Sequence, residues 1–212
     1  MSRLIVGVTG NIASGKSETA RLLQRKGCAL VDADAVAHEV YGYDRALVQQ
    51  IAAEFGQDVV WSNGTLNRGK LGSLVFGRPE AMAALNRIVH PVLIGAIRDR
   101  IRSSLRIMNR VVLDAALIVE LGFAPECDYL VLVSASVKVR LKRLMERSSL
   151  TEDEAMRRIE SQLPEEAKLQ HADFVIKNES SREYLQEQID ALWEELMLRE
   201  REEGAPPAGD LE

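Results

Sequence analysis

A phosphate-binding loop lies near the start of the chain, where residues 10–17 read GNIASGKS. This stretch fits the pattern G-x-x-x-x-G-K-[ST] at every fixed position. The two glycines let backbone N–H groups approach a phosphate closely, and Lys16 supplies positive charge to the β- and γ-phosphates. Ser17 offers a hydroxyl to Mg²⁺ and opens a helix whose N-terminal dipole favours anions. The motif therefore predicts a site for a nucleoside triphosphate.

Five short apolar runs predict the architecture around this loop. The run before the loop, residues 4–9, is nearly continuous, as in a buried parallel strand. After the loop, Leu22 and Leu23 give a helix an apolar face, and Gly27 is a signal for the end of that helix. The other runs cover residues 28–31, 110–114, 128–133 and 173–177. We therefore expect an α/β fold with a five-stranded parallel sheet and helices on both faces.

The charge of the chain limits its partners. The net charge is −5 and the pI is near 5.4, so no global positive field draws the chain to nucleic acid or to an anionic membrane. No apolar run approaches the length needed to span a bilayer, and the first strand leaves no room for a signal peptide. We therefore expect no nucleic acid and no membrane as partners, and a cytoplasmic location.

The length of the chain, 212 residues, suits one domain of the larger kind with insertions. Its two cysteines, Cys28 and Cys127, lie in apolar surroundings without the spacing of a C-x-x-C motif or a zinc site. Both are expected to be reduced thiols of the core rather than partners in a disulfide.

The acidic residues Asp32 and Asp34 follow the second apolar run. The strand period of two places the two carboxylates on one face at the carboxyl end of the strand, where open α/β sheets bind ligands. One carboxylate would then assist Mg²⁺ and the other would accept a proton from an attacking hydroxyl. The alternative is a helix N-cap aspartate beside a solvated aspartate.

Between residues 35 and 107 the pattern changes to helices separated by turns. This stretch is too long for an ordinary crossover and indicates an inserted helical segment that shapes a substrate site. His90 precedes Pro91, a pair that usually marks a turn, and a lone histidine is more often structural than catalytic. The other predicted elements are a polar turn at residues 62–64 and helices over residues 46–55, 70–76 and 79–88.

Further charged residues suit a phosphate site. Asp114 ends the third apolar run, where a carboxylate often holds Mg²⁺ or water, although an ordinary strand-end aspartate fits equally well. On a helix after residue 136, Arg140, Arg143 and Arg147 form one stripe, which is either a solvated face or a clamp for a transferred phosphoryl group. The face of this helix turned to the protein is expected to contain Val137, Leu141 and Leu144.

The last part of the chain predicts a lid, a closing helix and a tail. Thr151 to Glu154 form a capping box that opens a helix reaching to about Leu163. Together with the preceding charged helix it predicts a mobile cover that excludes water from phosphoryl transfer. Residues 201–212 are expected to be a disordered tail. The closing helix is predicted from the amphipathic set Leu185, Ile189, Leu192, Trp193 and Leu196.

Together these motifs resemble the dephospho-coenzyme A kinase family across roughly residues 3 to 195. Only the phosphate loop is widely shared among nucleotide-binding proteins, so the set as a whole is far more specific than its first member. The matches are Gly10 to Ser17, Asp32 to Asp34, Gly64 to Arg68, Asn86 to Pro91, Leu117 to Glu120, Arg143 to Arg147, Gln162, Ala172 with Asp173, and Asn178.

The resemblance implies an activity and an organisation. The activity is transfer of the γ-phosphoryl group of ATP to the ribose 3′-hydroxyl of dephospho-coenzyme A, the last step of coenzyme A synthesis, with Mg²⁺ as cofactor. A monomer or a weak homo-oligomer is expected. The implied parts are a P-loop kinase core of residues 1–34, 108–137 and 166–200, a helical substrate-binding segment of residues 35–107, and a lid of residues 138–165.

The resemblance also implies roles for individual residues. Asp34 would be the catalytic base, Lys16 would hold the β- and γ-phosphates, and Arg143 would stabilise the moving charge. Asn178 and the loop after it would lie near the adenine of ATP. Further implied contacts are those to Mg²⁺ (Ser17 and Asp32), to ATP (Asn11, Ile12, Ala13, Ser14, Gly15, Glu18 and Arg147) and to dephospho-coenzyme A (Asp34, Arg68, His90 and Leu117).

The chain departs from the family pattern in three places. Asn11 and Ala13 stand where glycine is common in the loop, Ala116 replaces a proline, and Ser148 replaces an acid or amide. Asparagine tolerates a left-handed backbone, whereas alanine does so poorly. None of these changes removes a charged group that the chemistry needs.

Three other kinds of function share parts of the pattern. Another small-molecule P-loop kinase, which phosphorylates a nucleoside or a nucleotide, would have the same loop and lid. Only the specificity for the acceptor would distinguish the two kinases. A GTPase switch needs N-K-x-D after a late strand, which the sequence around Asn178 does not supply. A dinucleotide-binding oxidoreductase needs G-x-G-x-x-G, which is absent.

Overall fold

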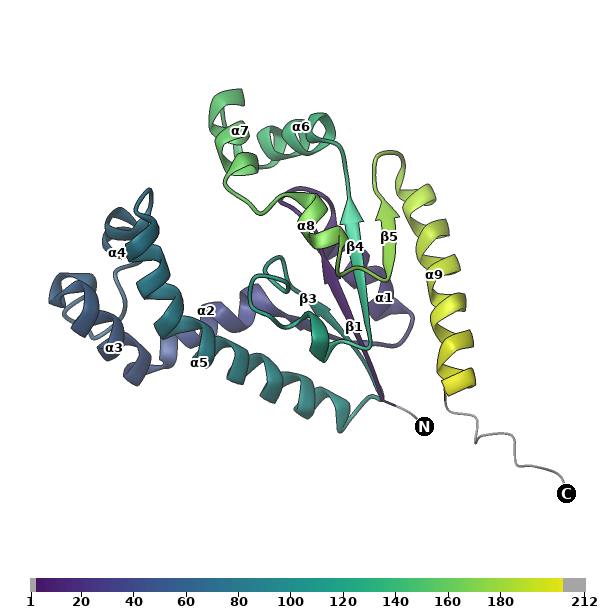
Figure 1. Ribbon diagram of the computed structural model, residues 1–212, viewed down its shortest axis with the longest axis horizontal. Coiled ribbons are helices and arrows are strands. Elements are labelled where there is room, and N and C mark those ends of the chain that lie inside the picture. Colours follow the sequence, from purple (N-terminus) through teal and green to yellow (C-terminus); the bar gives the residue numbers. More distant parts are fainter. Residues whose placement is uncertain (1–2, 204–212) are drawn as a thin grey trace, which may run out of the picture. The chain divides into compact units, whose positions relative to one another are not determined.

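The computed structural model describes residues 3–203, which form two compact units (Figure 1). The core unit comprises residues 3–31 and 101–203, and the helical unit comprises residues 32–100. The phosphate loop belongs to the core unit, whereas Asp32, which ends the second strand, and Asp34 begin the helical unit.

The core unit is built on a five-stranded sheet with the strand order β2-β3-β1-β4-β5. β1 pairs in parallel with both β3 and β4, and β4 pairs in parallel with β5. The α/β fold and its parallel sheet are therefore confirmed. The strand bounds, which differ from the predicted ones by one residue at most, are β1 Leu4–Thr9, β2 Ala29–Asp32, β3 Arg110–Asp114, β4 Tyr129–Ser134 and β5 Phe174–Lys177.

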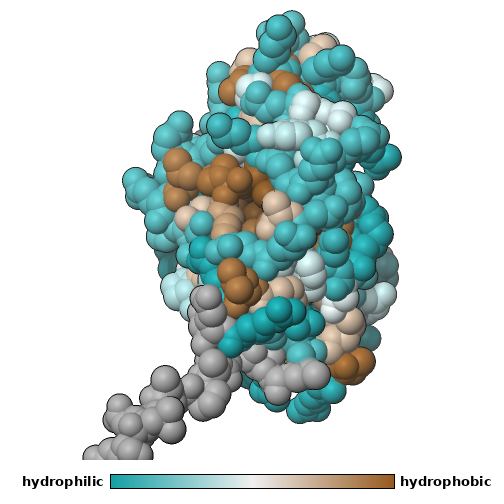
Figure 2. Space-filling model, turned by 90° about the vertical axis from the view of Figure 1, so that its right-hand side faces the viewer, coloured by the Kyte–Doolittle hydropathy of each residue, from teal (hydrophilic) through white to brown (hydrophobic). Residues whose placement is uncertain are grey.

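One face of this sheet packs against α1 (Lys16–Arg25) and α9 (Arg182–Glu203). Leu23 of α1 and Ile189 of α9 are fully buried in the same cluster as Val6 of β1. Figure 2 shows the molecule from the side of α9, where hydrophilic residues cover most of the surface and apolar side chains gather in one main patch. Because β1 and α1 are both fixed by this core, the phosphate loop between them is held at both ends.

Three helices lie between β4 and β5, namely α6 (Val137–Ser148), α7 (Glu152–Glu160) and α8 (Glu165–Leu169). The capping box at Thr151 is confirmed, because its side chain and that of Glu154 exchange hydrogen bonds with the backbone. The hydrogen bonds that the Glu154 carboxylate accepts from the backbone N–H and the hydroxyl of Thr151 lower the pKa of Glu154. The helix that they open is shorter than predicted and ends at Glu160, and the short helix α8 was not predicted.

The helical unit consists of several short helices and one long helix joined by turns. The polar turn predicted at residues 62–64 is confirmed, with Gly64 at a φ of 83° inside the bridge between Val60 and Leu66. The first helix, α2, was expected only under the alternative in which an aspartate caps a helix. The helices of this unit are α2 Ala33–Tyr43, α3 Arg45–Phe55, η1 Gln57–Val59, α4 Arg68–Val75 and α5 Pro79–Leu105, whose last residues enter the core unit.

The turn predicted at His90 and Pro91 is wrong, because α5 continues through both residues for a total of 27. A proline inside a helix costs about 3 kcal/mol through a lost hydrogen bond and a steric clash. Burial along one face of α5 offsets this cost, because every fourth residue from position 89 to position 101 is buried and forms an apolar stripe. The stripe consists of Val89, Leu93, Ile97 and Ile101.

Helix α5 is also the one helix within residues 3–203 that is long and apolar enough to cross a membrane. The expectation that no apolar run approaches that length is therefore wrong. Length and composition are weak evidence for a span, because a core helix of a soluble protein passes the same test.

Both cysteines are free, as predicted. Burial raises the pKa of Cys28 to about 11 and that of Cys127 to about 12, so both thiols stay protonated at neutral pH. Inert thiols of this kind fit core packing.

The disordered tail was predicted to begin at residue 201, but α9 continues to Glu203. The remainder of that predicted tail, residues 204–212, lies outside the described residues.

Candidate active site

The phosphate loop joins the end of β1 to the start of α1. Gly15 is the N-cap of α1 with a φ of 97°, and its carbonyl accepts the backbone N–H groups of Glu18 and Thr19 at 3.1 Å. No side chain among the described residues caps this helix. The first amides of α1, those of Lys16 and Ser17, therefore lack a partner within the helix and favour an anion.

The backbone of this loop leaves no room for a Cβ atom at either glycine. At Gly10 a Cβ atom would lie 2.5 Å from Ser14 Oγ. At Gly15 it would collide with the side-chain nitrogen Nδ2 of Asn178. Ala13 has a φ of 61°, so the alanine adopts the left-handed conformation that the sequence marked as unfavourable. Asn11, the other departure in the loop, is not among the described residues with positive φ.

Gly15→Ala should weaken ATP binding, because the loop must shift to relieve both the collision and the left-handed backbone. We expect a loss of about 1–3 kcal/mol in binding free energy, measured by titration calorimetry. Gly27→Ala is the matched control, because Gly27 has a φ of 101° but no atom within 4 Å of its Cβ position. Equal ATP affinities in the two variants would contradict a role for the close approach at Gly15.

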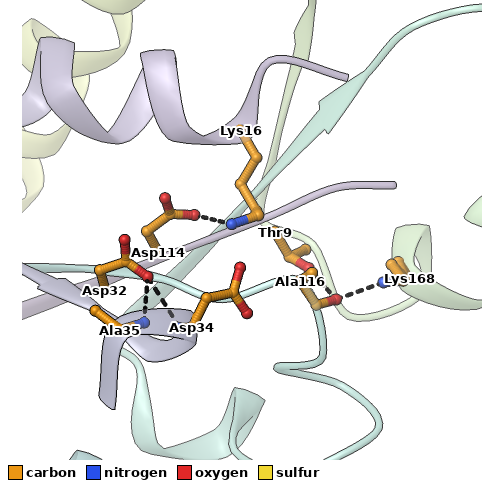
Figure 3. A network of polar contacts seen from close by, with 8 residues as sticks. All are labelled: Thr9, Lys16, Asp32, Asp34, Ala35, Asp114, Ala116 and Lys168. Atoms are coloured by element: carbon orange, nitrogen blue, oxygen red, sulfur yellow. Dashed lines mark hydrogen bonds and ion pairs between the residues drawn. The ribbon is translucent and has the colours of Figure 1, made fainter. Parts of the chain in front are cut away.

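Lys16 forms a hydrogen-bonded ion pair with Asp114 (Figure 3). The lysine side chain is 10% exposed and that of the aspartate 4% exposed, so the pair is buried. Asp114 ends β3 and is aligned with Val8 on the neighbouring strand β1. It is therefore not a solvated strand-end residue, because it holds the lysine of the phosphate loop. An incoming polyphosphate offers Lys16 a second anion at this position.

Several buried polar atoms around the loop have no partner among the described residues. Buried polar atoms are normally hydrogen-bonded, so an unpaired group in a loop of this kind is a candidate partner for a polar ligand. The atoms are Asn11 Oδ1, Ser14 Oγ and Thr19 Oγ1. Together with the unpaired helix amides and Lys16, they fit a phosphate chain.

Arg143 of α6 and Asn178, which follows β5, both contact the phosphate loop. The Arg143 guanidinium donates from Nη1 to the carbonyls of Ala13 and Ser14, at 3.5 and 3.4 Å. Its Nη2 donates to Asn178 Oδ1 at 3.4 Å. Asn178 Nδ2 donates to the Ser14 carbonyl at 2.8 Å. The structure thus brings together three parts that are far apart in the sequence.

The other two arginines of the predicted stripe do not share this position. Arg140 is buried, and its Nε donates to the carbonyl of Ala135 at 3.1 Å. Arg147 is exposed, and so is Val137, which was expected to face the protein. The prediction that the three arginines form one equivalent stripe is therefore wrong. One of the three supports the start of its own helix, and Arg143 lies against the loop.

The two aspartates after the second strand do not share a strand face. β2 ends at Asp32 and α2 begins at Ala33, so the period of two does not reach Asp34. Asp32 Oδ1 accepts the backbone N–H groups of Asp34 at 2.9 Å and Ala35 at 3.1 Å (Figure 3). The N-cap alternative is therefore confirmed for Asp32. The exposed carboxylate of Asp34 stands in the first turn of α2.

Arg68 and His90, two of the expected substrate contacts, lie in the helical unit. The Arg68 guanidinium is 3.0 Å from His38 Nδ1 and lies over the ring of Tyr41, 5.4 Å from its centroid. Burial lowers the pKa of His90, so its imidazole is neutral at neutral pH. Leu117 belongs to the core unit and is 48% exposed, which leaves its side chain open to a ligand.

Sequence reasoning missed Lys168 of α8, a lysine with no exposed side-chain surface. Its ammonium group donates to the Ala116 carbonyl at 2.6 Å and pairs with Glu120 at 3.1 Å. A lysine in a polar stretch that follows Glu165 and Glu166 gives no local signal of burial. Gln162 was noticed as a family match without a structural role, and its side chain contacts the phosphate loop.

Comparison with known proteins assigns this chain to a family. The family model for dephospho-CoA kinase matches residues 4–183. The chain belongs to the dephospho-CoA kinase family. A dephospho-CoA kinase of Streptomyces avermitilis is 38% identical over 201 residues, which cover 95% of this chain and 98% of that relative.

Two solved structures are similar to this chain over most of its length. A protein from Thermus thermophilus has a TM-score of 0.75 at 33% identity, over 92% of this chain and 99% of its own. A dephospho-CoA kinase from Campylobacter jejuni has a TM-score of 0.61 at 25% identity, over 92% of this chain and 97% of its own. The dephospho-CoA kinase family uses ATP to phosphorylate dephospho-CoA in the final step of coenzyme A biosynthesis.

Proposed function

We propose that this chain transfers the γ-phosphoryl group of ATP to the ribose 3′-hydroxyl of dephospho-CoA. The observation that carries the proposal is the phosphate loop, with Lys16 buried against Asp114 beside an uncapped helix N-terminus. The hydroxyl oxygen bonds to the γ-phosphorus while the bond to the β,γ-bridging oxygen breaks and ADP leaves. The proton of the hydroxyl goes to a base, and the products are coenzyme A and ADP.

Two cations at the loop would neutralise the charge of the transferred group. Lys16 would hold the β- and γ-phosphates, and the guanidinium of Arg143 would stabilise the charge that moves to the leaving group. Support comes from the hydrogen bonds that the Arg143 guanidinium donates to the carbonyls of Ala13 and Ser14 in the phosphate loop. Catalysis of this kind depends on position and charge rather than on a covalent intermediate.

Asp34 would be the base that accepts the hydroxyl proton. Within residues 3–203, no donor is bonded to its carboxylate, and the cap of α2 uses its backbone N–H rather than its side chain. The carboxylate is therefore available to an acceptor hydroxyl.

Mg²⁺ would be held by the Ser17 hydroxyl and by the Asp32 carboxylate. Ser17 stands in the first turn of α1, and the cap of α2 uses only Oδ1 of Asp32. Among residues 3–203, no group of three or more His, Cys, Asp or Glu side chains forms a metal site. This sparse set fits Mg²⁺, which keeps water ligands and binds through substrate phosphates. When bound, the ion supplies further neutralisation of phosphate charge.

The acceptor would bind through Asp34, Arg68, His90 and Leu117, and Asn178 would lie near the adenine of ATP. In the helical unit, Arg68 lines a pocket of about 210 Å³, which suits a ligand with an anionic group and an apolar arm. The other residues of this pocket are Tyr41, Leu66, Leu71, Gly72, Val75, Phe76, Met82 and Leu85.

We also propose a cytoplasmic enzyme that is a monomer or a weak homo-oligomer, without nucleic acid or membrane partners. The net charge of −5 supports the absence of polyanionic partners.

A panel of acceptors tests the proposed reaction. The purified chain is incubated with ATP, Mg²⁺ and one of dephospho-CoA, adenosine, a nucleoside monophosphate or water alone, and product masses are followed. We expect phosphate on dephospho-CoA alone. Phosphorylation of a nucleoside or nucleotide instead would be consistent with a kinase but would show that dephospho-CoA is not the acceptor. Hydrolysis of ATP alone would favour a nucleotide switch.

A further inference from the structure

The segment from Gln162 to Lys168, here called the strap, links the lid helices to β5 and contacts the phosphate loop at its first end. Gln162 Oε1 accepts the backbone N–H of Ile12 at 2.7 Å. Asn11 Nδ2 donates to the Leu163 carbonyl at 3.3 Å. The first end of the strap is therefore fixed to the loop that follows β1.

The other end of the strap is fixed to the loop that follows β3. Lys168 Nζ donates to the Ala116 carbonyl at 2.6 Å, and the same carbonyl accepts the Thr9 hydroxyl at 3.2 Å (Figure 3). A carbonyl has two lone pairs, so these two donors satisfy it. Glu120, in the same loop, pairs with Lys168 at 3.1 Å. Lys168 thus holds both the backbone and an acidic side chain of this loop.

The carbonyl that Lys168 holds is two residues from the partner of the phosphate-loop lysine. Asp114 ends β3 and pairs with Lys16, and the backbone N–H of Ala115 is bonded to the Val8 carbonyl at 3.1 Å. The Ala116 carbonyl comes next in the chain. Only Ala115 stands between the two residues, so the backbone that carries Asp114 is held by β1 at Ala115 and by Lys168 at Ala116.

A buried charge of this kind needs an explanation other than stability. A lysine is almost never fully buried unless it is paired, because removal of the ammonium group from water is costly. Buried ion pairs can often be replaced by apolar side chains of similar volume without loss of stability. The burial of Lys168 is explained instead if its two contacts fix the geometry of the loop.

We propose that Lys168 is a positioning residue for phosphoryl transfer. From the strap it fixes the loop after β3, and through Asp114 it sets where the ammonium group of Lys16 stands. The inference rests on the proposed function, because it assigns Lys16 to the phosphates of ATP. Gln162 anchors the other end of the same strap to the phosphate loop, so one segment spans both sides of the site.

The test compares Lys168→Met with the wild type. Methionine keeps the length and apolar volume of the stem and removes the charge. We expect kcat to fall about tenfold to a hundredfold, with little change in the KM for dephospho-CoA, because misplaced catalytic groups cost rate rather than acceptor affinity. Lys138→Met is the control, because Lys138 is an exposed lysine of α6, and it should leave kcat unchanged.

A double-mutant cycle with Thr9→Val separates positioning from folding. If Lys168 and Thr9 act through one carbonyl, the loss of kcat in the double variant should be smaller than the product of the single losses. A loss of kcat in the double variant equal to the product of the two single losses would show that Lys168 and Thr9 do not act through the same carbonyl. An unchanged kcat in folded Lys168→Met, or a lower Tm alone, would overturn the proposal. If Lys168→Met yields no folded protein, an unchanged kcat in Thr9→Val would overturn it.

The wild type separates this inference from the proposed function. If the wild-type chain does not phosphorylate dephospho-CoA, the proposed acceptor fails, and the cycle is measured with the acceptor that the panel identifies. If the wild type phosphorylates dephospho-CoA and the variants match it, the role of Lys168 alone fails.

Discussion

Asp34→Asn should lower kcat for the phosphorylation of dephospho-CoA by about 10²- to 10⁴-fold, the usual contribution of a general base. ATP binding should stay close to that of the wild type, because the substitution removes a proton acceptor and touches no group of the phosphate loop. Steady-state kinetics with dephospho-CoA and calorimetry with ATP measure the two quantities.

The structure makes Asp34→Asn a clean test. The N-cap of α2 uses the backbone N–H of Asp34 and the carboxylate of Asp32, so the substitution leaves the cap in place. Asp58→Asn, a change of the same kind at an exposed residue of η1, is the control and should leave kcat unchanged. Wild-type turnover in Asp34→Asn would remove this residue from the role of base.

The sheet and the phosphate loop were predictable because their signals are local. A strand that is buried on both faces must be apolar along its length, and the run at residues 110–114 gave the bounds of β3 without error. The phosphate loop depends on glycines and a lysine at fixed spacing. A Cβ atom at Gly10 or Gly15 would collide with neighbouring atoms, which explains why both positions are glycine.

Other features were missed where two local rules compete or where tertiary contacts decide. The residues around Asp32 fit either a strand with period two or a helix cap, and the cap prevailed because Asp32 satisfies two amides of α2. At Pro91, the local rule for a turn was overridden by the buried stripe of α5.

The role of Lys168 could not be read from the sequence, because it depends on a contact with Ala116, 52 positions away in the chain. The same limit applies to Arg140 and Arg143. Both arginines belong to α6, and their spacing in the sequence predicted that they lie on the same face of this helix. In the structure Arg140 bonds to the start of its own helix, whereas Arg143 reaches a loop that is about 130 positions earlier.

Arg143→Ala should lower kcat by about 10³-fold, as expected for an arginine that stabilises charge in phosphoryl transfer. Within residues 3–203, no carboxylate pairs with Arg143, and its partners are the carbonyls of Ala13 and Ser14 and the amide of Asn178. Its removal therefore leaves no buried acid unpaired, and we expect little change in Tm. The cost should fall on the transition state, where the positive charge is needed.

The size and the type of this effect can be separated with two further variants. Arg143→Lys keeps the charge but loses the planar fork of donors, so its kcat should lie between those of the wild type and Arg143→Ala. Lys142→Ala, on the same helix with a side chain 79% exposed, is the control for general loss of positive charge. If Arg143→Ala instead raises the KM for ATP and leaves kcat unchanged, Arg143 binds the nucleotide equally in the ground and transition states, and its contact with the loop serves affinity rather than catalysis.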